Sequence, residues 1–534
     1  MGFPFDQYHT QFPPKEHEQA RYDIYGAWYS GDVIELETIW GKSPMAKNNE
    51  AFWSKSFKDT GISRVHVPLA SDMAQTSADI LFAGVPDITI PEAEEETNGR
   101  ATQAYDRLME IVAKSGLLNT LLEAGEASSA LGGVFVKPVW DADFCDYPLL
   151  SIVQADHAIP EFQWDVLKAV TFWKVIKEEK DEEQPGKKKI WRLFERHCIE
   201  NRKAVIYNAI HCGEIDKIGE AIPLNSYPGY ENLSERIDTG YDSLMVRYIP
   251  NIKPNRLMRG SALGQSDLAG VEPLLDAIDE TYSSLMRDIR LARARLVVPE
   301  KYIDFNATTD GYTKTQFNNE KAVYAPINVD PMLDRDAKMT VTQFDIRTEK
   351  HINTILDLIE RVVTHAGYSP QTFGLKLEGA ESGKALSIRE RKTFTTRQKK
   401  WRYWSSALED LLHMLLYIDN VFLNNKTPFD FRPSVEIAES ADRDISVLAE
   451  TMRTLHDAQA MSLDTKVRML HPEWTDEQVQ AEIEMIKEEF AIGQTVDGLT
   501  SIDDAMDRTR FNSDDFESTE DEPAEDEEIE IEEE

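Results

Sequence analysis

One segment of the chain resembles the phosphate-binding loop of nucleotide-hydrolysing enzymes. Gly379 to Ala385 reads Gly-Ala-Glu-Ser-Gly-Lys-Ala, which is one residue short between its glycines. In a working loop the backbone amides cradle the phosphates, the lysine contacts them, and a serine or threonine reaches the magnesium ion. Ala385 stands where that hydroxyl is needed. We therefore expect a glycine-containing loop that enters a helix at Lys384, and no nucleotide site.

Two pairs of neighbouring residues suggest zinc ligands. His197 stands beside Cys198, and His211 stands beside Cys212. Adjacent residues on a strand point to opposite faces, so one pair rarely supplies two ligands, and the spacing typical of zinc sites is missing. The segment 141–152 begins like a calcium loop but lacks its sixth-position glycine and ends on isoleucine. Since no catalytic constellation emerges, we expect no enzyme activity, no metal and no cofactor.

The most pronounced local charge feature is a basic run that begins after a glycine-containing loop. From Lys384 to Arg402 the charge is +7 in 19 residues, with Glu390 as the one acid. Such a helix can pair with acidic surface of its own or a neighbouring subunit, or contact nucleic-acid phosphates transiently. The loop at 367–383 should be mobile because of its glycines. The candidate contact residues of the basic run are Lys384, Arg389, Arg391, Lys392, Arg397, Lys399, Lys400 and Arg402. Those of the loop are Gly374, Lys376, Gly379 and Gly383.

The chain as a whole is strongly acidic. Across 534 residues, 58 Lys and Arg stand against 96 Asp and Glu, which gives −38. Affinity for nucleic acid comes largely from cations that neutralise phosphates, so the chain is a poor candidate for a tight, non-specific DNA binder, although it can surround DNA without binding it tightly. Residues 493–534 predict a disordered acidic tail. The three cysteines, the absence of a signal sequence and the lack of a long apolar stretch predict a soluble protein of a reducing compartment, with no membrane contact.

Two helical patterns precede the glycine-containing loop and the basic run in the second half of the chain. Apolar residues recur at steps of three and four over 270–298 and over 341–366, as on one face of a helix. Short β-like pieces are expected at 296–298 and 322–329, in and beside the segment 299–340 between them. A third long helix is expected from about Lys384 to Val421, within the segment 384–430. A projecting helix pair would bury its apolar stripe against copies of itself, which favours a ring with head-to-tail contacts. The packing residues are Leu275, Ile278, Tyr282, Leu285, Ile289, Ile352, Ile355 and Ile359.

The remaining segments complete an α+β fold. The aromatic-rich arm at 1–40 packs either on its own domain or on a neighbouring subunit. A helix is expected over 101–130, followed by a β-rich block over 130–250. Beyond a short strand at 431–437, we expect helices over 463–470 and 475–490.

The order of these features resembles the portal proteins of tailed bacteriophages over roughly residues 20–490. The resemblance depends on several motifs in sequence order, each of which is weak alone. They are the run Gly132 to Asp141, Gln154 to Pro160, Ile249-Pro250-Asn251 with Gly260 to Leu268, Glu381 to Leu386, and Met461 to Pro472 before an acidic helix.

The resemblance implies a dodecameric ring at one capsid vertex, through which double-stranded DNA is packaged and ejected. The implied partners are further copies of the chain, the DNA, the terminase large subunit, head-completion or adaptor proteins, and the major capsid and scaffold proteins. The implied location is the virion, with the host cytoplasm during assembly. Another structural head protein, or a packaging nuclease or ATPase, is the alternative.

The resemblance also implies a division of the chain. The wing would comprise 41–269, the stem helices 270–298 and 341–366, the clip 299–340, and the crown 431–492. The tunnel loop would be 367–383, where Gly374, Lys376, Gly379, Gly383 and Lys384 would approach the DNA.

Overall fold

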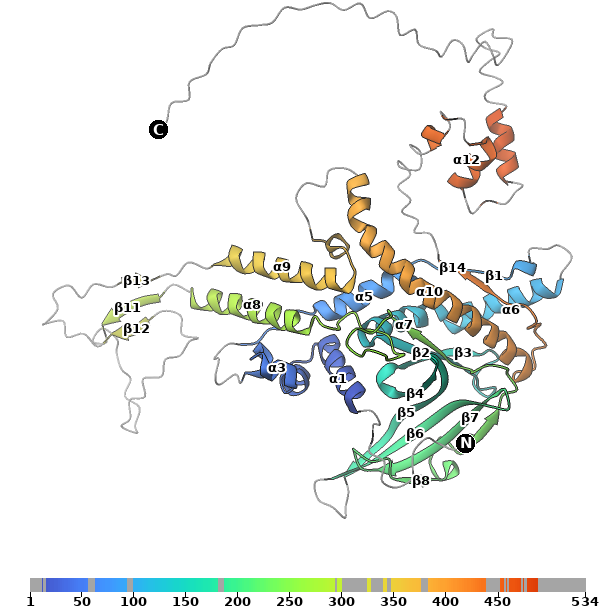
Figure 1. Cartoon of the computed structure of the whole chain (residues 1–534), viewed down its shortest axis with the longest axis horizontal. Helices are drawn as coiled ribbons and strands as arrows, with labels where there is room; N and C mark the ends of the chain where they lie inside the picture. Colours follow the sequence, from blue (N-terminus) through green and yellow to red (C-terminus); the bar gives the residue numbers. More distant parts are fainter. Residues whose placement is uncertain are drawn as a thin grey trace, which may run out of the picture. The chain divides into compact units, whose positions relative to one another are not determined.

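The structure, a computed structural model, separates into two compact units, Met1–Glu439 and Ser440–Glu534 (Figure 1). It combines helices and sheets, which confirms the predicted mixed fold. The residues that it describes are 12, 16–55, 63–93, 99–180, 187–292, 295–299, 324–327, 340–342, 347–375, 383–437, 452–455, 458, 461–471, 474 and 478–487.

The N-terminal segment packs on its own chain in the part that the structure describes. Trp28, Trp40, Phe52 and Trp53 are buried in one apolar core, so the first of the two alternatives for this aromatic-rich region holds for residues 16–55. The elements are α1 (Glu16–Ser30), α2 (Val33–Glu35), η1 (Leu36–Trp40), α3 (Pro44–Asn48), η2 (Phe52–Ser54) and α5 (Leu69–Phe82).

The predicted helix over 101–130 is two helices, α6 (Gly99–Ser115) and α7 (Leu117–Leu131). Gly116 between them has a φ of 64°, the left-handed region that interrupts a helix. Gly132 ends α7 with a φ of 87°, and a Cβ there would lie 2.8 Å from the backbone nitrogen of Ser266. A glycine is therefore needed where the chain turns from α7 into the first long strand.

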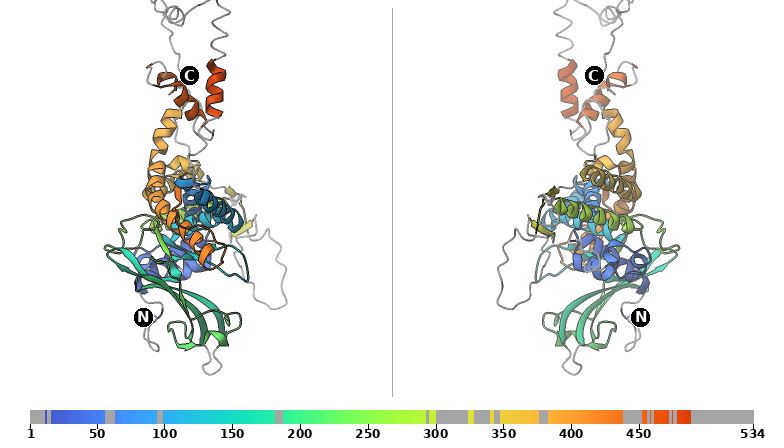
Figure 2. Two further views of the ribbon diagram at one scale, coloured as in Figure 1. Left: turned by 90° about the vertical axis from the view of Figure 1, so that its right-hand side faces the viewer. Right: turned by 90° about the vertical axis from the view of Figure 1, so that its left-hand side faces the viewer.

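The predicted β-rich block is confirmed as two antiparallel sheets (Figures 1 and 2). The smaller sheet has the order β10-β2-β3, and the larger has the order β4-β5-β6-β7-β8, with β9 also paired to β7. Their strands are β2 (Gly133–Val139), β3 (Leu149–Gln154), β4 (Ala158–Gln163), β5 (Val166–Lys180), β6 (Lys188–Glu200), β7 (Lys203–Gly213), β8 (Glu220–Ile222), β9 (Arg236–Asp238) and β10 (Arg247–Pro250).

Three long helices follow, α8 (Glu272–Leu291), α9 (Thr348–Ala366) and α10 (Gly383–Val421). Helices α8 and α9 lie side by side (Figure 1), and the interior of α10 packs in the first unit's largest apolar core. The predicted bounds of α10 are confirmed as far as Val421, because Gly383 opens the helix and no residue within it is a helix breaker.

The predictions for the first two helices were too long at one end. Strand β11 (Arg295–Pro299) replaces the end of the predicted helix over 270–298 and confirms the β-like piece predicted at 296–298. It pairs with β12 (Tyr324–Ile327), which lies within the piece predicted at 322–329, and with β13 (Thr340–Thr342). Strand β13 likewise replaces the start of the helix predicted over 341–366. The valines and threonines of these segments favour strands once a partner strand is present.

A short pair, β1 (Asp87–Thr89) with β14 (Ser434–Glu436), ties the end of the first unit back to its beginning. In the second unit, α12 (Leu463–Leu470) confirms the helix predicted there, and residues 478–487 are helical within the predicted 475–490. Val467, Val479 and Ile483 form its small core.

Several predicted segments lie outside the described residues. They are most of 299–340, the loop residues 376–382, the start of the arm and the tail 493–534. Among the helices that the structure describes, none is long and apolar enough to cross a membrane.

Candidate functional site

The α8–α9 pair buries its apolar stripe at one end. Leu275, Ile278 and Ile355 are buried in the same core as the N-terminal aromatic residues, and Tyr282 and Ile359 pack against it while half-buried. This end of the stripe therefore packs within a single chain, whereas the sequence pattern was interpreted as a stripe buried against further copies.

The other end of the pair exposes apolar side chains. Ile289 is 42% exposed and Ile352 is 43% exposed. Both lie at the same end, because Asp288 accepts a hydrogen bond of 2.9 Å from Arg347 at the start of α9. Leu285, one turn before Ile289, is buried. The predicted stripe thus continues beyond what this chain covers by itself.

Two carboxylates on α8, which the sequence analysis missed, hold the N-terminal segment. Asp276 accepts hydrogen bonds from Trp40 Nε1 at 2.8 Å and from the backbone N–H of Phe52 at 2.6 Å. Asp279 accepts from Trp53 Nε1 at 3.0 Å and from the backbone N–H of Val67 at 2.8 Å. Burial raises the pKa of Asp276, and the hydrogen bonds that it accepts oppose that rise.

The spacing of these two carboxylates on α8 explains why both contact the N-terminal segment. Residues three apart on a helix share one face, so Asp276 and Asp279 point at the same partner segment. His66 adds a contact, with Nδ1 2.9 Å from Asp279 Oδ2. The pattern of two acids on an otherwise apolar face was visible in the sequence, but its tryptophan partners lie more than 200 positions away.

The described part of the predicted tunnel loop is held firmly to α10. Gly367 ends α9 with a φ of 101°, and a short turn, η7 (Pro370–Phe373), precedes Gly374. The backbone N–H of Ser369 donates to Thr393 Oγ1 at 2.8 Å, and Thr396 Oγ1 donates to the carbonyl of Gly367 at 2.6 Å. Lys376 and Gly379 lie outside the described residues.

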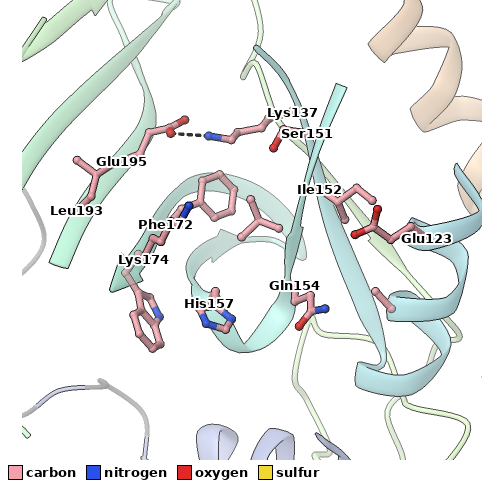
Figure 3. Close-up of a pocket in the computed structure, with 13 residues that line it drawn as sticks. Glu123, Lys137, Ser151, Ile152, Gln154, His157, Phe172, Lys174, Leu193 and Glu195 are labelled. Carbon is pink, nitrogen blue, oxygen red and sulfur yellow. Dashed lines mark hydrogen bonds and ion pairs between the residues drawn. The ribbon is translucent and has the colours of Figure 1, made fainter. Parts of the chain in front are cut away.

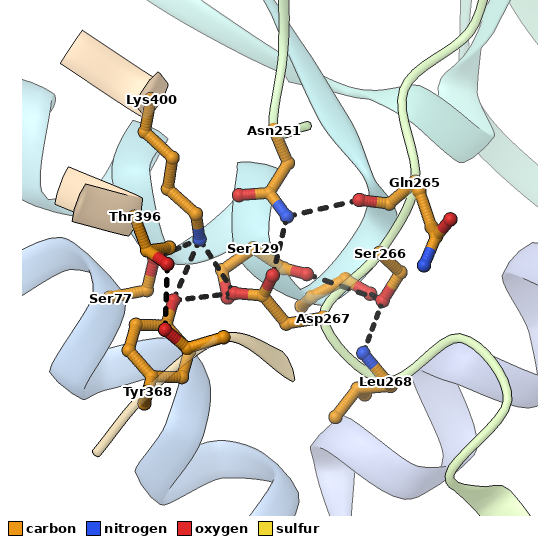
Figure 4. A network of polar contacts seen from close by, with 12 residues as sticks. Ser77, Ser129, Asn251, Gln265, Ser266, Asp267, Leu268, Tyr368, Thr396 and Lys400 are labelled. Carbon is orange, nitrogen blue, oxygen red and sulfur yellow. Dashed lines mark hydrogen bonds and ion pairs between the residues drawn. The ribbon is translucent and has the colours of Figure 1, made fainter. Parts of the chain in front are cut away.

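Lys400 is buried, which contradicts the expectation that every cation of the basic helix is available to DNA or to a neighbouring subunit. Its side chain is 1% exposed, and its ammonium donates to Asp267 Oδ2 at 2.6 Å, to Ser77 Oγ at 2.7 Å and to Tyr368 Oη at 2.7 Å (Figure 4). Burial lowers the pKa of Lys400, and the Asp267 carboxylate opposes that shift. The Lys400 ammonium therefore links three segments inside the chain. Its partners come from α5, the 260–268 segment and the turn after α9. It is unavailable to DNA or to a neighbouring subunit.

The network around Asp267 is complete. Ser129 Oγ donates to Asp267 Oδ2 at 2.6 Å, and Asn251 Nδ2 donates to Asp267 Oδ1 at 2.8 Å (Figure 4). A buried charge is tolerated when it is paired and hydrogen-bonded on all sides. The network joins the turn after α9 to the end of α7 and to the segment after β10.

The other basic residues of α10 differ in exposure. Arg391, Lys399 and Arg402 are exposed. Lys392 is exposed too, and its Nζ donates to the carbonyl of Thr364, while Arg397 is half-buried. The side chains of Lys384 and Arg389 lie outside the described ones.

A cavity of about 410 Å³ lies between the two sheets and α7 (Figure 3). Glu195 forms an ion pair there with Lys137 and is hydrogen-bonded to His197, whose pKa is lowered by burial. Burial by itself would raise the pKa of Glu195, but the hydrogen bonds and charges of His197 and Lys137 hold it at about 2. Within the described part of the chain, no group of three His, Cys, Asp or Glu residues is arranged to hold a metal ion.

Comparison with known proteins gives one clear result. No curated protein matches this chain. A family model described as "Phage portal protein, SPP1 Gp6-like" matches residues 16–492. The match spans both described units and every motif of the resemblance, and the chain therefore belongs to the SPP1 Gp6-like family of phage portal proteins.

Proposed function

We propose that this protein forms a dodecameric ring at one vertex of a phage capsid, and that double-stranded DNA passes through the centre of the ring during packaging and ejection. A portal family is structural and implies a ring of identical copies at the capsid vertex. In this proposal the ring also receives the terminase large subunit, and later the head-completion proteins, at the clip.

The observation that carries the proposal is the unequal burial of the α8–α9 pair. One end is locked into the core, whereas Ile289 and Ile352 are exposed together at the other end. Apolar residues gathered at one end of a projecting element are typical of a contact with another subunit. We assign the stem to α8 and α9, the wing to 41–269, the clip to 299–340 and the crown to the second unit.

The charge of the chain suits a channel through which DNA slides. A wall with few cations binds phosphate weakly, and this chain carries −38 overall. Exposed cations of α10 such as Arg391, Lys399 and Arg402 would give brief contacts to DNA or ion pairs with a neighbour. Gly383, Lys384 and the loop before them would lie nearest to the DNA.

The test is the double substitution Ile289→Asn/Ile352→Asn in the full chain. Because both side chains are exposed, the fold should persist, while assembly measured by sedimentation velocity should require a higher protein concentration. Val85→Asn, at a residue that is 61% exposed elsewhere, is the matched control. Unchanged assembly of the double variant would contradict a stem contact between subunits.

A further inference from the structure

An exposed aromatic side chain projects from the loop between β2 and β3. Phe144 is 78% exposed, and Asp141, Asp143 and Asp146 around it are exposed as well. The carbonyl of Asp141 accepts backbone hydrogen bonds from Phe144 at 3.1 Å and from Cys145 at 3.0 Å, and its Oδ1 accepts from the backbone N–H of Asp143 at 3.0 Å. An ordered turn therefore presents a phenyl ring surrounded by carboxylates, which we call the Phe144 knob.

A groove of about 700 Å³ lies beside the turn between β4 and β5. Its lining includes Phe162, Trp164, Leu257, Met258 and Leu263. An apolar cavity of roughly 150 Å³ is enough to hold a benzene ring. The groove, which we call the Trp164 groove, therefore has room for a phenylalanine side chain and part of the turn that carries it.

Trp164 lies in a left-handed backbone conformation that bulky residues rarely adopt. Trp164 and Asp165 have φ values of 52° and 61°, and they form the two-residue turn that joins β4 to β5. Such turns favour Asn-Gly because both residues need a positive φ, and a bulky residue there is unusual. Trp164 is nevertheless 88% exposed. The turn between β6 and β7 has the same geometry at Asn201 and Arg202, so the feature particular to this turn is the exposed indole beside the groove.

The groove carries charges of both signs, and its exposed arginines can face the carboxylates of the knob. The loop that forms part of the groove carries Arg256 and Arg259, which are both exposed and form no ion pair with another described residue. Glu18 and Asp165 also line the groove, so the attraction for the knob depends on the two arginines. The knob brings three carboxylates and no cation.

The knob and the groove lie at opposite ends of β2. At the knob end, Val139 pairs with Leu149. At the groove end, Gly133 pairs with Pro250, and a Cβ on Gly264, which directly follows the groove loop, would lie 2.2 Å from the carbonyl oxygen of Gly132. A strand of this length separates its ends by roughly 20 Å. One chain therefore cannot close this contact on itself through β2, whereas two copies in head-to-tail order can.

We propose that the Phe144 knob of one copy inserts into the Trp164 groove of the next copy, with the knob's carboxylates facing Arg256 and Arg259. This inference rests on the proposed ring and names a surface through which neighbouring wings meet. A contact between unlike surfaces closes into a ring when its rotation closes.

The experiment compares full-length variants by sedimentation velocity, with the protein concentration of half-assembly as the readout. Phe144→Ala should raise that concentration by about tenfold, as expected for an aromatic anchor at an interface. Ile215→Ala, at a residue that is 70% exposed, is the control and should leave it unchanged. The double variant W164N/D165G installs the favoured turn, so its thermal stability should equal or exceed that of the wild type while its assembly weakens.

A charge exchange tests the pairing itself. Asp143→Arg and Arg259→Asp should each weaken assembly, and the two together should restore it in part. If the wild type forms rings and Phe144→Ala and W164N/D165G form them equally well, the knob contact is wrong and the proposed ring stands. A wild-type chain that stays monomeric at every concentration would overturn the ring and this contact together.

Discussion

Lys400 carries a positive charge into the interior of the first unit, where Asp267 is its ionic partner. Lys400→Met should destabilise the fold by about 3–5 kcal/mol, because it leaves the Asp267 carboxylate buried without a countercharge. Lys399→Met, at an exposed neighbour on the same helix, should change stability by less than about 0.5 kcal/mol. Urea denaturation of both variants measures the difference, and equal midpoints would contradict the role given to the buried pair.

Glu195 should make the free energy of unfolding depend on pH. Its pKa in the folded chain is about 2, against an ordinary value of 4.5. Because the folded-state pKa is depressed, this carboxylate stabilises the fold above pH 4.5, and that stabilisation is lost as the pH falls toward 2. Glu195→Gln should lower the unfolding free energy at pH 7 and flatten its decline between pH 4.5 and 2.

Urea denaturation at several pH values provides the measurement for Glu195. Glu123→Gln is the matched control, because Glu123 lines the same cavity but is exposed. Its pH profile should follow that of the wild type. A Glu195→Gln variant that declines as steeply as the wild type over this range would show that the ion pair and the hydrogen bond of Glu195 contribute little.

At the scale of elements, α8 is braced by the N-terminal segment through Asp276. Asp276→Asn should destabilise the fold by about 1–3 kcal/mol, because an NH2 group that can only donate replaces a carboxylate oxygen that accepts hydrogen bonds. Hydrogen exchange should quicken at the backbone N–H of Phe52. Arg287→Gln, on the exposed side of α8, should leave that exchange unchanged. Slow exchange at Phe52 in both variants would mean that apolar packing alone holds the segment.

The sequence predicted the elements best where their signals are local. The bounds of α10 and α12 and the strands between 130 and 250 follow from periodicity and residue type. The β-like pieces at 296–298 and 322–329 were also predicted, but the helix predicted over 270–298 overlapped the first of them, and only the pairing of Leu296 with Tyr324 and Val341 decides between helix and strand. Strand formation there depends on those partners and not on local preference.

Prediction of the candidate site was limited in the same way, by contacts between segments that are distant in the chain. The apolar stripe of α8 and α9 was found from its spacing, but the spacing could not tell that part of the stripe packs inside the chain. The basic run was also found, but charge alone could not separate the buried Lys400 from the exposed Lys399. The acceptor roles of Asp276 and Asp267 were missed, since the donors that surround them come from segments far apart in the sequence.

At the scale of the whole molecule, the acidic chain, the family and the partly exposed α8–α9 pair converge on a ring. The measurement that tests this most directly is negative-stain electron microscopy of the purified full-length chain, with end-on class averages analysed for rotational symmetry. We predict rings with a central hole and roughly twelve lobes, since closed cyclic symmetry satisfies every head-to-tail contact. Compact single particles without rings at any concentration would contradict the account.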